Sequence, residues 1–73
     1  MKYKIRDVIV FKNNKLVIII TNVDEKEQMY TCSFLGLNDV FPNNLLDDDD
    51  IVACGGMLIG NDLDFGTVRM LYL

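Results

Sequence analysis

The chain has 73 residues, no histidine, no tryptophan and only two cysteines, and 51% of its residues are apolar. This length allows a single small domain spanning residues 1–73, because domains usually run from about 50 to 250 residues. The apolar content argues against intrinsic disorder, and the missing histidine with so few cysteines argues against zinc sites and disulfide scaffolds. We therefore expect one folded domain without a cofactor or a bound metal.

The net charge of -4 is distributed unevenly along the chain. Residues 1–23 carry five basic side chains and one acidic side chain, whereas residues 24–73 carry two basic and ten acidic side chains. If the two segments form separate faces, the molecule is dipolar, and its acidic part would attract a basic partner and repel nucleic acid.

No segment is apolar over the roughly 18–20 residues that a membrane-spanning helix needs. The start of the chain, with Lys2, Lys4 and Arg6, resembles the basic region of a signal peptide, but Asp7 interrupts the apolar stretch that should follow. We expect a cytoplasmic protein with reduced thiols. Cys32 and Cys54 form no CxxC pair, so both are expected to be buried as small apolar side chains.

The first half of the chain predicts three strands joined by short turns. Residues 3–12 and 15–23 are rich in β-branched and aromatic side chains, and Asn13-Asn14 between them favours a two-residue hairpin turn. The polar residues 24–27 predict the next turn. Residues 28–35 then predict a third strand, in which Tyr30, Cys32 and Phe34 lie on one face and alternate with Met29, Thr31 and Ser33 on the other.

The second half predicts shorter strands. Residues 36–39 favour a turn, and Pro42 limits the next strand to Val40-Phe41 because proline cannot donate to a ladder. Asn43 or Asn44 is expected to cap a single helical turn through Leu45 and Leu46. A second hairpin is predicted with residues 51–59 and 63–73 as arms and 60–62 as its loop, and Gly55-Gly56 is expected to mark a bulge or a sharp bend.

Five consecutive aliphatic residues, Leu16–Ile20, carry the strongest constraint on the fold. A strand with one wet face alternates between apolar and polar residues, and this one does not, so both of its faces must be covered. The cover is either the C-terminal segment, residues 57–59 and 68–73, or a second copy of the chain. We expect an all-β fold, a small antiparallel SH3-like barrel of five or six short strands with no long helix, and a homodimer.

Part of the chain also resembles a known group of proteins. The shared features are Asp7-Val8, the Asn13-Asn14 turn, the aliphatic strand Leu16–Ile20, Cys32 with Phe34, and Phe41-Pro42 with Leu45. In this arrangement, residues 7–46 are similar to small uncharacterised bacterial and phage proteins with an SH3-like β-barrel. The resemblance implies the fold and implies no activity.

Asp47–Asp50 is the most distinctive motif. An EF-hand loop needs glycine at its sixth position and glutamate at its twelfth, but counting from Asp47 these positions hold Val52 and Leu58. The run therefore predicts a solvated acidic loop, and the alternatives are a docking patch for Lys and Arg side chains of a partner and a weak Mg²⁺ or Ca²⁺ site. Nucleophilic catalysis by a cysteine or a serine would require a neighbouring base, and with no histidine in the chain we expect no enzymatic activity.

These observations predict a non-enzymatic protein-binding module, of the kind that a phage or mobile element uses to inhibit a host protein by occupying a basic surface on it. The expected contact residues are Asp47, Asp48, Asp49 and Asp50, with Tyr3, Phe41 and Tyr72 as aromatic anchors. The alternative is a nucleic-acid or nucleotide-binding barrel that uses the basic first hairpin, in which Lys and Arg residues surround Tyr3.

Overall fold

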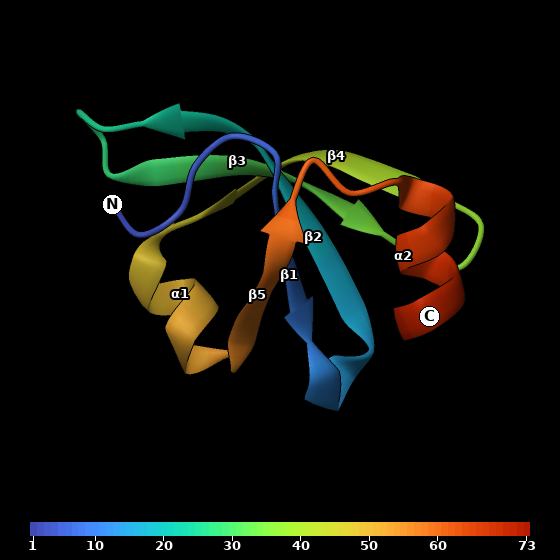
Figure 1. Ribbon diagram of the computed structural model, residues 1–73. Coiled ribbons are helices and arrows are strands. Elements are labelled where there is room, and N and C mark those ends of the chain that lie inside the picture. The colour runs from blue at the N-terminus through green and yellow to red at the C-terminus, as the bar shows by residue number, and fades with distance from the viewer.

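The computed structural model describes residues 1–73. It consists of a five-stranded antiparallel sheet with one short helix on each face (Figure 1). The strand order is β4-β3-β2-β1-β5. In chain order the elements are β1 (Asp7–Phe11), a short 3-10 helix (Lys12–Asn14), β2 (Leu16–Asp24), β3 (Met29–Leu35), β4 (Val40–Leu46), α1 (Asp48–Ala53), β5 (Gly56–Asn61) and α2 (Phe65–Tyr72).

The predicted SH3-like barrel is wrong, because the sheet is open. Strands β4 and β5 are its two edges and do not pair with each other. Closing a sheet requires its first and last strands to share a ladder. The residues that follow β5 form α2 and cover a face of the sheet instead, so no further strand is left to close it. The prediction of a mostly β protein with short antiparallel strands and no long helix is confirmed.

The apolar core is divided into two layers by the sheet. On one face α1 contributes the fully buried Ile51, and on the other α2 contributes Val68, which is 2% exposed. The first layer contains Ile9, Phe11, Ile18, Ile20, Tyr30, Cys32 and Ile51, and the second contains Val8, Val10, Val17, Ile19, Leu35 and Val68. Alternate residues of β1 and β2 therefore face opposite layers, as the side-chain period of two in a strand requires.

Strand β2 is covered on both faces, and the cover comes from the same chain. Ile18 and Ile20 pack in the layer of α1, whereas Val17 and Ile19 pack in the layer of α2. Of the two covers considered from the sequence, the C-terminal segment is present on one face, where Val68 belongs to the layer of α2 and Ile59 and Leu73 pack against it. The other face is covered by Ile51 of α1, which the sequence did not predict. Covering β2 therefore requires no second copy, and the homodimer stays a prediction.

The first hairpin has a longer turn than the Asn13-Asn14 pair predicts. Residues 12–14 form the 3-10 turn, and Lys15, not an asparagine, adopts the left-handed backbone conformation with φ of 49°. The third strand lies where the sequence places it. Tyr30 and Cys32 share the α1 layer with the partly buried Phe34, which confirms the predicted alternation in β3.

The predictions for residues 40–46 are wrong, since β4 continues through Leu46 without a helical turn. Its register against β3 shifts between Cys32 and Phe34, so that Pro42 and Asn43 face a single residue of β3 as a bulge. Asn43 has φ of 65°. A proline is compatible with a strand at such a bulge on an edge, because no ladder hydrogen bond is required of it there.

The predicted second hairpin is also wrong. Residues 56–61 form β5, but residues 65–72 form α2, whose first turn is capped by the side chain of Asp64 accepting from the Thr67 backbone N–H at 3.0 Å. The sharp bend expected at the glycine pair is present, since Gly55 has φ of 74° between α1 and β5.

The two cysteines lie in different environments. Cys32 is buried in the core as predicted, and burial raises the pKa of its thiol to about 11. Cys54 follows α1 and is exposed, so the prediction that it is buried is wrong. Neither helix of the structure has the length and apolar character needed to cross a membrane.

Candidate interaction site

A concave surface of about 320 Å³ lies beside the first turn of α1, and we call it the acidic hollow. Six residues line it, namely Glu27, Gln28, Met29, Asp47, Asp48 and Asp49. Four of the six are acidic, and none is basic. The hollow therefore contains three of the four aspartates that the sequence singles out.

The strand pairing explains how two distant segments meet in this hollow. Tyr30 of β3 is paired with Leu46 of β4, so the residues just outside this pair, Met29 and Asp47, come side by side. Glu27 lies in the turn before β3, where its backbone N–H donates to the Asp24 side chain at 3.1 Å. Glu27 and Met29 were not predicted as site residues, because Pro42 indicated an earlier end of β4 and so concealed this pairing.

Asp48 is held in place by the core and by the start of the chain. The buried Tyr30 hydroxyl donates a hydrogen bond to the Asp48 carboxylate, which also accepts from the Lys2 backbone N–H at 3.2 Å. The same hydroxyl accepts from the Tyr3 backbone N–H at 2.9 Å. Burial, together with donation to Asp48, raises the pKa of Tyr30 to about 12. One carboxylate of the hollow is thus fixed by a chain of hydrogen bonds.

Asp47 and Asp50 have local structural roles at the start of α1. The Asp47 side chain accepts from the Asp50 backbone N–H at 2.7 Å, and the Asp50 side chain accepts from the Asp47 backbone N–H at 3.2 Å. This reciprocal capping box satisfies backbone donors that a helix start leaves unpaired. Asp49 and Glu27 are exposed, and their side chains accept no hydrogen bond, so their carboxylates are free to meet a cation.

The three aromatic residues proposed as anchors do not form one surface with the hollow. Tyr3 is closest to it, and its half-buried ring packs edge-on against Tyr30 with centroids 5.7 Å apart. Burial, and then the nearby carboxylates of Asp48 and Asp7, raise the pKa of Tyr3. Phe41 is 56% exposed at the opposite end of β4, roughly 17 Å from Leu46 at 3.3 Å per residue.

Tyr72, the third proposed anchor, is 37% exposed near the end of α2. Because α2 and α1 cover opposite faces of the sheet, Tyr72 lies on the other side of the molecule from the start of α1 (Figure 1). Of the aromatic residues named from the sequence, only Tyr3 is therefore positioned to contribute to a contact at the hollow.

The basic residues of the first hairpin are divided between the two ends of β1. Lys12 and Lys15 follow β1, whereas Lys2, Lys4 and Arg6 precede it, and its five residues span roughly 17 Å. The basic and acidic segments also meet, since the Arg6 Nη1 lies 3.7 Å from the Asp62 Oδ1. The two segments therefore do not form the separate faces considered from the sequence.

No group of three or more Cys, Asp or Glu side chains has a geometry suited to hold a metal ion. Comparison with known proteins gives no match to a family model, to a curated protein or to a solved structure.

Proposed function

We propose that the chain is a non-enzymatic protein-binding module that docks its acidic hollow onto a Lys or Arg side chain of a host protein. The observation that supports this proposal is the convergence of four carboxylates from two separate segments on one concave surface without a basic residue. An inhibitor that occupies a basic cleft of its target would use such a surface, because complementary charge accelerates association and selects the partner.

The side chains of the hollow match the two parts of a long basic residue. The carboxylates of Asp49 and Glu27 are available to the charged head, and Met29 offers an apolar surface to the methylene stem. Arg is favoured over Lys, because its guanidinium can donate to more than one carboxylate at once. The Tyr30 hydroxyl orients Asp48 in advance, which lowers the cost of ordering the site on binding.

The test is a titration of the protein with a short fluorescent arginine-rich peptide at low ionic strength, read by anisotropy. We expect binding that weakens steadily as salt is added. The double variant Glu27→Gln and Asp49→Asn should lower the affinity about threefold to tenfold, because each exposed ion pair contributes up to about 1 kcal/mol. These substitutions leave the capping box of α1 and the Asp48 hydrogen bonds intact.

The matched control is the double variant Glu25→Gln and Asp39→Asn, which removes the same net charge by the same two types of substitution from exposed positions outside the hollow. It should change the affinity less than twofold. Equal losses in the two double variants would mean that only net charge matters, and the hollow would then have no specific role. Submicromolar binding of a single-stranded oligonucleotide under the same conditions would instead support a nucleic-acid-binding module.

A further inference from the structure

A second concave surface, which we call the apolar pocket, lies where the segment before β1 meets the loop between β5 and α2. Its volume is about 390 Å³, within the range of pockets that hold small molecules. Its lining includes the buried side chains of Val8 and Ile19 and the partly exposed side chains of Leu63 and Phe65. It shares no residue with the acidic hollow.

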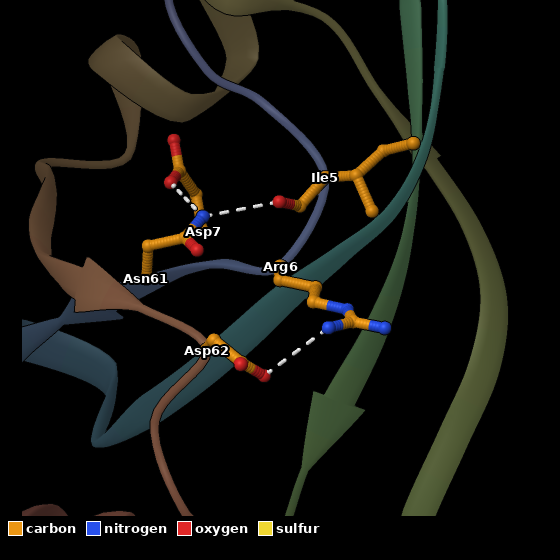
Figure 2. Close-up of polar contacts among 5 residues, drawn as sticks. All are labelled: Ile5, Arg6, Asp7, Asn61 and Asp62. Atoms are coloured by element: carbon orange, nitrogen blue, oxygen red, sulfur yellow. Dashed lines mark hydrogen bonds and ion pairs between the residues drawn. The ribbon is translucent and has the colours of Figure 1, made fainter.

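Two opposite charges flank this pocket. Figure 2 shows the side chains of Arg6 and Asp62 reaching toward each other, with Nη1 and Oδ1 3.7 Å apart. Both side chains are about two-thirds exposed, at 67% and 69%. Since 3.7 Å is too long for a hydrogen bond, the guanidinium donors and the carboxylate acceptors are available to a ligand.

The backbone fixes both charged residues. Arg6 and Asp62 adopt the left-handed conformation, with φ of 75° and 57°, and the Asp62 backbone N–H donates to the Arg6 carbonyl at 2.9 Å. Behind them, the Asn61 side-chain amide donates to the buried Asp7 carboxylate at 2.9 Å and to the Ile5 carbonyl at 3.0 Å (Figure 2). Non-glycine residues in this conformation need such support, and they often occur at binding sites.

We infer that the apolar pocket binds a small zwitterion with an apolar tail, the chemistry of a free amino acid with a large aliphatic or aromatic side chain. The ligand's carboxylate accepts from the Arg6 guanidinium, and its ammonium group donates to the Asp62 carboxylate. Its side chain enters the apolar lining beside Val8, Ile19 and Phe65. Charge complementarity to a cation and an anion at one opening favours this ligand over a purely anionic or purely apolar molecule.

An NMR titration of the ¹⁵N-labelled protein with L-phenylalanine and with L-leucine tests the proposal. Saturable shifts are expected in the millimolar range at the amides of Val8, Ile19, Leu63 and Phe65. Three analogues each lack one part of the ligand: 3-phenylpropanoate has no ammonium group, 2-phenylethylamine has no carboxylate, and glycine has no tail. Each should bind about tenfold more weakly or not at all, because one charge-assisted or apolar contact is lost.

Matched variants separate the two charges from general effects on the fold. Arg6→Asn and Asp62→Asn each remove one charge and keep a residue type that tolerates the left-handed conformation, so the backbone should persist. Each is expected to weaken L-phenylalanine binding about tenfold. The control, Lys15→Asn, makes the same change at a left-handed position outside the pocket and should have no effect.

Three results would overturn the proposal. These are the absence of saturable shifts with either amino acid, equal affinity for the analogues that lack one charged group, and an equal loss of affinity in the Lys15→Asn variant. Binding of the arginine-rich peptide at the acidic hollow is measured separately and involves other residues, so either proposal can fail while the other stands.

Discussion

Replacing Tyr30 with Phe removes one buried hydroxyl and keeps the ring in the core. The hydroxyl donates to the Asp48 carboxylate and accepts from the Tyr3 backbone N–H at 2.9 Å. Hydrogen bonds to charged groups contribute about 1.5–3 kcal/mol and neutral ones about 0.5–1.5 kcal/mol. Because Asp48 and Tyr3 are only half-buried, water can replace part of what they lose. We therefore expect Tyr30→Phe to lower the free energy of unfolding by about 2–3 kcal/mol.

Urea denaturation measures this loss, and a thermal melt should show a midpoint lower by roughly 10–20 °C, at about 4–8 °C per kcal/mol for a chain of this size. The matched control is Tyr3→Phe, which deletes the same atom from a neighbouring ring whose hydroxyl makes no hydrogen bond within the chain. Tyr3→Phe should lower the free energy of unfolding by less than about 0.5 kcal/mol. If Tyr30→Phe costs no more than this control, the proposed anchoring of Asp48 is wrong.

Three further predictions concern the core. The pKa of Tyr30 is raised from 10.0 to about 12, so the unfolded chain releases this proton at a lower pH than the folded chain does. The contribution of Tyr30 to the free energy of unfolding should therefore be present below pH 10 and decline toward pH 12. Urea denaturation at several pH values in this range should show the decline, and Tyr30→Phe should reduce it. Gly56→Ala should lower the free energy of unfolding, measured by urea denaturation, by about 1–3 kcal/mol, because its new Cβ would lie 2.6–2.9 Å from three core side chains. The control Gly36→Ala, whose Cβ would make ordinary van der Waals contacts, should lower it by less than about 1 kcal/mol. A thiol reagent should modify Cys54 rapidly and Cys32 only on unfolding, and equal rates in the native protein would contradict the burial of Cys32.

Local patterns in the sequence were sufficient to predict the central strands. The uninterrupted aliphatic run of β2 required cover on both faces, and the structure provides it from α1 and α2. The predicted alternation in β3 also holds, since Tyr30 and Cys32 lie together in the layer of α1. These features depend only on the side-chain period of a strand, which the sequence displays directly.

The second half of the chain was harder to interpret, since its residues suit more than one structure. Leu63–Leu73 has the composition of a strand, but Asp64 is also of a residue type that caps helix starts, and in the structure its side chain accepts from the Thr67 backbone N–H at the start of α2. The apolar residues Met70 and Leu71 favoured a strand in the sequence, but in α2 they are 78% and 67% exposed. Because residues 65–72 form α2, they add no strand to the sheet, and the sheet stays open.

Only part of the candidate site could be predicted. The run Asp47–Asp50 indicated an acidic contact, but Glu27 lies in the turn before β3 and Met29 begins β3, and placing them beside the run requires the register of β3 against β4. That register depends on the bulge at Pro42, which the sequence suggested would end the strand. Pairing between strands is a non-local property, so residue patterns within one strand do not determine it.

The central structural claim is that one chain covers both faces of β2. Methyl NOE spectroscopy tests it most directly. The sample is one that light scattering shows to be monomeric, with the mass of one 8.3 kDa chain. We expect NOEs from Val68 to methyl groups of its layer, which includes Val17 and Ile19, and from Ile51 to methyl groups of the other layer, which includes Ile18 and Ile20, all within that single chain. Loss of either set in the monomer, or NOEs that arise only between differently labelled copies, would contradict it.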